Sequence, residues 1–272
     1  MVFRIIYLIL AIIAVSAASS VSRIVGGTPT TIFDYPFLVS VEYYNPGSNT
    51  TVQRCVGSLI SSWHVLTSAY CFTDANQENV GIRAGSTTSL FGGSVVRVAE
   101  LIIHPDYVEN PRVADIAIVV LATPLIISPT VNVVYIPPQQ TYIPAGYPVE
   151  IISWGFEADG GSQLTSLEKI DSNVLGQEQC AAAYESIESV TIYDQVLCAA
   201  SNGTSICSAD SGAPLIIGEI LAGLSSYYVS CDDSTPDVFT RIDRHTGWIL
   251  EHAVPPAGRT VSAPVRVARS VL

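Results

Sequence analysis

The chain has 272 residues and a formal net charge of −12. This negative charge disfavours nucleic acids and anionic membranes as partners, because both would repel the protein. The length is sufficient for one large all-β domain or for two fused barrels. No apolar run reaches the ~20 residues that cross a bilayer, so we expect an exported protein with no membrane partner.

The amino-terminal residues 1–18 have the features of a secretory signal peptide. Arg4 supplies the positive start, Ile5–Val15 the apolar run, and Ser16–Ala18 a small-residue cleavage region. An uncleaved membrane anchor is the alternative, but the apolar run is too short for one. We therefore predict a secreted, extracellular protein.

Short apolar or alternating runs recur along the chain and are separated by clusters of turn residues, which predicts an all-β barrel or sandwich. The clearest runs are Phe37–Tyr43, Val56–Ile60, Val96–Ile103, Ile116–Leu121, Pro148–Trp154 and Leu215–Leu224. A proline-rich stretch from Pro137 to Pro148 predicts the connection between two halves.

The carboxyl-terminal region predicts one helix and a tail. Asp243 is a candidate cap for a helix over residues 244–254, which Pro255 would end. Residues 255–272 contain three arginines, no acidic residue and no clear period, so we expect a flexible basic tail. Docking of this tail on the acidic body is the alternative.

An even number of cysteines in an exported chain predicts disulfides. Fifteen pairings are open to six cysteines, and no Cys-x-x-Cys spacing indicates a zinc or redox site. We predict no metal and no cofactor. The cysteines are Cys55, Cys71, Cys180, Cys198, Cys207 and Cys231.

Three short motifs contain residues suited to nucleophilic catalysis: Thr67-Ser68-Ala69-Tyr70-Cys71, Ala114-Asp115-Ile116-Ala117, and Asp210-Ser211-Gly212 after Cys207. Tyr70 and Asp115 are 45 residues apart, and Asp115 and Ser211 are 96 residues apart. These intervals are close to the ~45 and ~93 of a serine peptidase triad. Together with Ile24-Val25-Gly26-Gly27, the motifs resemble the chymotrypsin-like (trypsin-type) serine peptidase family over about residues 24–253.

The resemblance implies an all-β fold of two six-stranded antiparallel Greek-key barrels and a carboxyl-terminal helix. Barrel one would cover about residues 24–130 and barrel two about residues 131–243. The resemblance also implies the disulfides Cys55–Cys71, Cys180–Cys198 and Cys207–Cys231.

The resemblance assigns the nucleophile to Ser211 and the residue that orients the base to Asp115, but Tyr70 stands in place of the histidine base. A phenol with a pKa near ~10 does not accept the serine proton at neutral pH. It also offers one heteroatom, so it cannot bond Ser211 and Asp115 through separate atoms. The histidines at 64, 104, 245 and 252 are expected to be structural or solvated.

Further departures from the family affect the oxyanion hole and the specificity pocket. Ala209 replaces a glycine whose N–H, with that of Ser211, would bind the oxyanion. Ser205 stands at the pocket base where trypsins carry aspartate, and Tyr228 and Asp237 replace small glycines of the pocket walls. The pocket is therefore expected to be filled, although Asp237 could attract a basic group.

The resemblance also implies activation by a trypsin-like peptidase. Residues 19–23 form a short propeptide, and cleavage after Arg23 would free Ile24 to pair with Asp210. Asn49 and Asn202 begin glycosylation sequons.

These observations predict a secreted serine protease homologue without catalytic activity, which acts by binding a protease inhibitor, a peptide or an active peptidase. A weakly active serine endopeptidase, or one that works only at alkaline pH, is the alternative, because Ser211 and Asp115 are retained. A purely structural secreted product is a third hypothesis.

Overall fold

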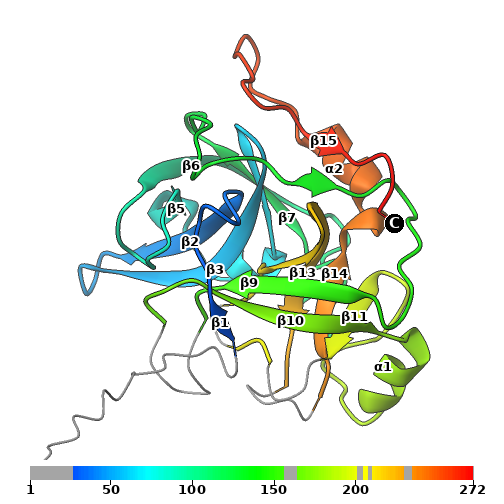
Figure 1. The fold of residues 1–272 in the computed structure, drawn as a ribbon. Coiled ribbons are helices and arrows are strands. Elements are labelled where there is room, and N and C mark those ends of the chain that lie inside the picture. The colour runs from blue at the N-terminus through cyan, green and yellow to red at the C-terminus, as the bar shows by residue number, and fades with distance from the viewer. Residues whose placement is uncertain (1–26, 156–163, 201–204, 208–209, 230–234, 272) are drawn as a thin grey trace, which may run out of the picture.

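The computed structural model describes residues 27–155, 164–200, 205–207, 210–229 and 235–271. Two β-barrels form the body, with strands β2–β7 in one and β9–β14 in the other (Figure 1). In the described part of the chain, no helix is long and apolar enough to cross a membrane.

The first barrel closes in the strand order β2-β3-β4-β7-β6-β5. Its pairs are antiparallel, with Leu38 opposite Ser58 and Leu66 opposite Ile118. Strand β7 is buried along its whole length, which agrees with its continuous apolar sequence. The strands are β2 (Leu38–Asn45), β3 (Thr50–Ser61), β4 (His64–Thr67), β5 (Val80–Ala84), β6 (Ser94–Ile103) and β7 (Ala117–Leu121), with short 3-10 helices η1 (Ala69–Phe72) and η2 (Gln77–Asn79) after β4.

The second barrel closes in the order β9-β10-β11-β14-β13-β12, because β12 pairs with both β13 and β9. Its ladders are antiparallel, so the predicted fold of two six-stranded barrels is confirmed. Its strands are β9 (Pro148–Ser153), β10 (Glu168–Leu175), β11 (Val196–Ala200), β12 (Pro214–Ile217), β13 (Ile220–Tyr227) and β14 (Asp237–Arg241); helix α1 (Gln177–Ala183) precedes β11, and the short strands β1 (Thr28–Pro29) and β8 (Tyr135–Ile136) pair with β10 and β13.

The apolar run at Leu215–Leu224 is a hairpin, where the sequence had suggested one strand. Gly218 has a φ of +59° and, with Glu219, makes a two-residue turn between Ile217 and Ile220. Only glycine adopts this region readily, so the turn reverses the chain inside an otherwise apolar segment.

The carboxyl-terminal helix is shorter than predicted and has no side-chain cap. Residues 242–244 form a 3-10 turn, η3 (Ile242–Arg244), before helix α2 (Thr246–His252). Asp243 is buried and accepts hydrogen bonds from the Arg241 guanidinium, with an Nε–Oδ1 distance of 2.8 Å. A buried carboxylate requires a partner, and this ion pair takes the side chain away from the cap position.

The tail after α2 packs on the body, so the expectation of a flexible segment was wrong. Strand β15 (Arg266–Val267) pairs in parallel with β8, and Ala268 N donates to Ile136 O at 2.9 Å. Trp63 Nε1 donates to Thr260 O at 3.0 Å, and Ala263 is buried. Figure 1 shows β15 against the upper right of the body. The tail is held there because Ala263 and Val265 pack on the hydrophobic core.

The two barrels meet at the loop before β12. Gly212 has a φ of +80°, and a Cβ at this position would lie 2.2 Å from the Val56 carbonyl oxygen. Val56 N donates to the Ser211 carbonyl oxygen at 3.0 Å. Glycine thus permits close backbone contact between the barrels and fixes Ser211 at their junction.

Candidate functional site

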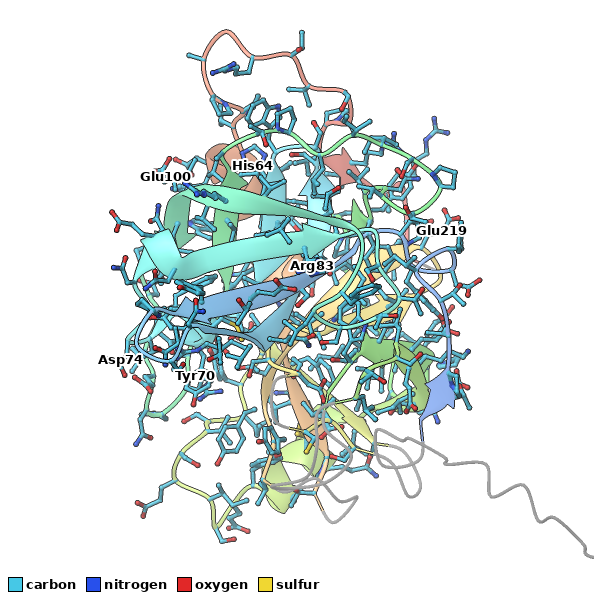
Figure 2. The ribbon with its side chains drawn as sticks, turned by 90° about the vertical axis from the view of Figure 1, so that its left-hand side faces the viewer. His64, Tyr70, Asp74, Arg83, Glu100 and Glu219 are labelled. Atoms are coloured by element: carbon cyan, nitrogen blue, oxygen red, sulfur yellow. A yellow bond between two sulfur atoms is a disulfide. The ribbon has the colours of Figure 1, made fainter. Side chains whose placement is uncertain are left out.

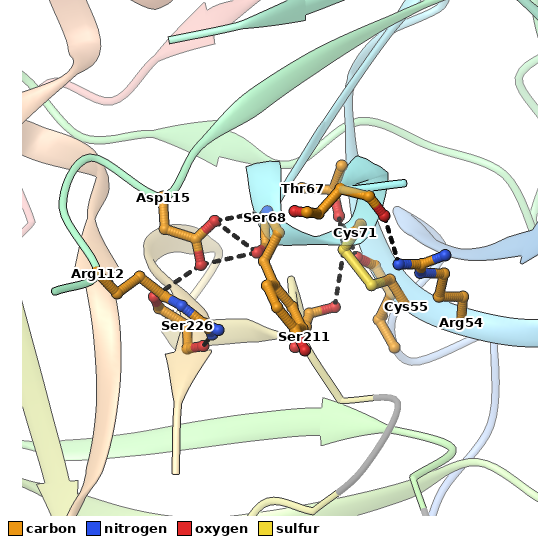
Figure 3. The surroundings of a disulfide bond; sticks show 12 residues. Arg54, Cys55, Thr67, Ser68, Cys71, Arg112, Asp115, Ser211 and Ser226 are labelled. Atoms are coloured by element: carbon orange, nitrogen blue, oxygen red, sulfur yellow. Dashed lines mark hydrogen bonds between the residues drawn. A yellow bond between two sulfur atoms is a disulfide. The ribbon is translucent and has the colours of Figure 1, made fainter. Parts of the chain in front are cut away.

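The structure brings the predicted triad positions together at the barrel junction. Ser211 is half-buried in the loop before β12, Asp115 lies two residues before the start of β7, and Tyr70 lies in η1. Tyr70 N donates to Asp115 Oδ1 at 2.9 Å, and Figure 3 shows Asp115 and Ser211 on either side of Ser68. The site therefore draws residues from both barrels.

The Asp115 carboxylate is buried and fully engaged by donors. Ser68 Oγ lies 2.7 Å from both carboxylate oxygens and donates to the carboxylate. Ser226 Oγ donates to Oδ2 at 2.7 Å (Figure 3). Burial raises the pKa of Asp115, while the nearby Arg112 charge and these hydrogen bonds lower it. Each side-chain donor to Asp115 among the described residues is a hydroxyl, and none is an imidazole.

Tyr70 reaches Asp115 through its backbone N–H, while its side chain points elsewhere. The Arg112 guanidinium carbon lies 3.9 Å from the centre of the Tyr70 ring, a cation–π contact. The Tyr70 residue is 36% exposed. Asp115 therefore gives no orientation to the phenol.

The histidines lie elsewhere and have structural partners. His64 is buried on β4, with Nδ1 2.7 Å from Ser61 Oγ and Nε2 3.2 Å from Val254 O. Figure 2 places it at the top of the view, well apart from Tyr70 at the lower left. His104 and His245 are in ring contact beside α2, and burial lowers the pKa of His245 to about 4.

Two of the three predicted pocket residues are in direct contact. Ser205 Oγ donates to Asp237 Oδ1 at 2.8 Å, and Ile206 N donates to Asp237 Oδ2 at 3.1 Å. Burial raises the pKa of Asp237 to about 7. Tyr228, the third, is partly buried and packs against the main core.

Asp210 is a second buried carboxylate near the junction. Its side chain accepts hydrogen bonds from Ser153 Oγ and from Cys207 N, the latter at 2.7 Å. Burial raises the pKa of Asp210 to about 7. No ion pair of Asp210 occurs within the described ranges. Its predicted partner Ile24 lies outside them.

Other predicted positions also lie outside the described residues. They are the signal peptide, Arg23, Ala209, Asn202 and Cys231. Asn49 is exposed at the tip of the β2–β3 hairpin, where its side chain accepts a hydrogen bond from Tyr44 Oη at 2.9 Å.

The disulfide pairing agrees with the prediction wherever both partners are described. Cys55 is bonded to Cys71, and Cys180 to Cys198. Cys207 is also disulfide-bonded. The first bond ties β3 to η1, and so holds Tyr70 beside the junction.

The family model for trypsin matches residues 24–249. The chain belongs to the trypsin family. Trypsin alpha of Drosophila melanogaster is 32% identical over 234 residues, covering 85% of this chain and 88% of that protein. Trypsin alpha-4 of Lucilia cuprina is 31% identical over 233 residues, with the same coverage. The crystal structure of the scabies mite inactivated protease paralogue S-I1 matches with a TM-score of 0.73 and 27% identity, covering 83% of this chain and 97% of that one.

Sequence reasoning about this trypsin-family chain missed Ser68 and Arg112. Ser68 is two residues before Tyr70 and bonds Asp115 across 47 positions of sequence. The position of Ser68 close to Tyr70 in the motif was the signal that could have indicated its role. Arg112 is three residues before Asp115, but only the folded loop brings it over the Tyr70 ring. In the described part of the chain, no group of three or more His, Cys, Asp or Glu side chains could hold a metal ion.

Proposed function

We propose that this chain is a secreted, catalytically inactive serine protease homologue that acts by binding. The observation that carries the proposal is the environment of Asp115, whose side-chain partners are the hydroxyls of Ser68 and Ser226. Without an imidazole beside it, Ser211 remains a weak alcohol nucleophile. Loss of one triad member reduces turnover by about 10⁴–10⁶.

Tyr70 is a poor substitute for the base. A phenol is a much weaker base than imidazole at neutral pH, and the Tyr70 ring is engaged with the Arg112 cation. Since the Asp115 carboxylate is bonded to other groups, it neither orients the phenol nor stabilises a protonated base.

Export is supported by the disulfides and by the relatives, which are trypsins. The matched scabies mite protein is titled an inactivated protease paralogue, which supports the same interpretation here. A rigid peptidase fold without turnover can sequester a protease inhibitor, bind a peptide or assemble with an active peptidase. These are the partners we propose, with a trypsin-like peptidase as the activator.

A weakly active or alkaline endopeptidase is the second candidate. Ser211 and Asp115 both lie at the barrel junction, as an active enzyme would require. In this candidate, the Tyr70 phenolate formed under alkaline conditions would accept the Ser211 proton.

Hydrolysis by cleaved, repurified protein distinguishes the two candidates. The assay uses a panel of small ester and amide substrates from pH 7 to pH 11, with Ser211→Ala as the matched background and Drosophila melanogaster trypsin alpha as the positive control. We expect the wild type to equal Ser211→Ala throughout. Turnover that rises with pH and disappears in Ser211→Ala would establish the alkaline enzyme instead.

A further inference from the structure

Arg112 lies in the space between the two barrels beside the triad positions. Its guanidinium carbon is 3.9 Å from the centre of the Tyr70 ring and 5.6 Å from that of Tyr227. Nη1 also donates a hydrogen bond to the Ser226 carbonyl oxygen (Figure 3). Two aromatic rings and a carbonyl from opposite barrels thus hold one cation.

The backbone around Arg112 is anchored on both sides. Arg112 N donates to Ser189 O at 3.2 Å, and Ala114 N donates to Tyr193 Oη at 3.1 Å. Ser189 Oγ is in turn hydrogen-bonded to the Tyr227 hydroxyl. The segment after α1 therefore fixes both the loop that carries Arg112 and one of the rings that clamp it.

The Ser226 carbonyl lies at an edge of the second barrel. The β12–β13 ladder ends at Leu224, and Ser225 is bonded to the loop before β12. A register shift between Ser225 and Tyr227 leaves Ser226 outside the β13–β14 ladder. Extended peptides bind proteins by adding a strand to such an edge, with main-chain hydrogen bonds as the primary contacts.

We propose that Arg112 is a built-in occupant of this cleft, which closes the Ser226 edge to extended peptides. The guanidinium uses the carbonyl that an added strand would bond and fills the space between Tyr70 and Tyr227. The same cation lies near the buried Asp115 carboxylate and lowers its pKa, so electrostatic attraction holds the Arg112 side chain in the cleft.

This inference rests on the proposed binding function and narrows it. A partner that inserts an extended loop into the cleft is disfavoured, because the loop would have to displace Arg112. Binding through the outer surface of the barrels, as in assembly with an active peptidase, needs no such displacement. Among the partners proposed above, the closed cleft therefore favours a folded protein over a free peptide.

The test measures binding of acetyl-tetra-alanine amide by its effect on the backbone amide NMR signals of residues 225–228. Alanine methyl groups need no deep pocket, so the probe reports the cleft edge and not the specificity pocket. All proteins carry Ser211→Ala, which removes any hydrolysis. Hydrolysis by the wild type would refute the proposed inactivity. The comparison in the Ser211→Ala background would still measure the effect of Arg112 on peptide binding.

We expect no saturable shift in the protein that retains Arg112 and saturable binding, at least tenfold tighter, after Arg112→Ala. Arg97→Ala, at an exposed arginine of β6, is the matched control and should behave like the parent. Arg112→Lys keeps the cation near Asp115 while removing the planar group, so it should fold even if Arg112→Ala does not, and should also gain binding. Equal binding by the parent and by a folded Arg112 variant, or no binding by either folded variant, would overturn the proposal.

Discussion

The Ser68 hydroxyl already donates to the Asp115 carboxylate, so we expect that restoring the histidine alone does not restore a triad. In Tyr70→His, the imidazole must displace a hydroxyl that lies 2.7 Å from both carboxylate oxygens. A hydrogen bond to a charged group contributes about 1.5–3 kcal/mol, which corresponds to about 10–150-fold in rate. Ser68→Ala should therefore accelerate Tyr70→His by about that factor, and should have no effect while Tyr70 is present.

The assay is the second-order rate at which a small fluorophosphonate labels Ser211, since this reagent needs no open cleft edge. Ser62→Ala, at a second buried serine, is the matched control and should leave the Tyr70→His rate unchanged. If Tyr70→His alone labels at a peptidase rate and Ser68→Ala adds nothing, Ser68 does not obstruct Asp115 and the reasoning is wrong. Equal acceleration by Ser62→Ala would show a general loosening of the core instead.

Three further predictions concern stability and processing. The Asp210 pKa of about 7 is above its ordinary 3.8, so the folded uncleaved protein retains a proton that the unfolded chain releases. This retained proton stabilises the fold fully below about pH 4. As the pH rises to 7 the stabilisation is lost, and the free energy of unfolding falls by about 4 kcal/mol. Urea unfolding from pH 4 to pH 7 should show this loss relative to Asp210→Asn, and a constant difference would contradict the buried protonated state. Truncation after Val254 removes about three tail hydrogen bonds of roughly 1 kcal/mol each and should lower the Tm by about 5–10 °C, whereas an unchanged Tm would mean that the tail does not dock. Limited trypsin digestion should cleave after Arg23 and leave a stable body beginning at Ile24, as amino-terminal sequencing would report; a resistant Arg23 bond or rapid loss of the body would argue against zymogen-like processing.

The barrels could be predicted because their signals are strong and redundant, whereas the pairing of the described disulfides followed from the family resemblance alone. Alternating strands, turn clusters and motif intervals around Asp115 and Ser211 all indicate the same fold. The Leu215–Leu224 hairpin was missed, because the apolar residues on both sides of Gly218 concealed the turn that this glycine makes.

The contacts that decide the chemistry could not be predicted in the same way. Ser68 and Ser226 bond Asp115 across 47 and 111 residues of sequence. The sequence does not distinguish these two serines from the other serines of the chain. The Arg112 clamp requires rings from two barrels. The tail appeared flexible because its small apolar residues have no period, yet Ala263 fills a place on the core that only the folded body creates.

Labelling of Ser211 in the cleaved wild-type protein at neutral pH tests the central claim most directly. Intact mass and peptide mapping after treatment with a small serine-directed fluorophosphonate would measure the extent and the site of modification. Among the described residues no imidazole contacts Asp115, which predicts no labelling beyond that of Ser211→Ala. Prompt, stoichiometric modification of Ser211 would show that the serine is activated, and would contradict the account of an inactive homologue.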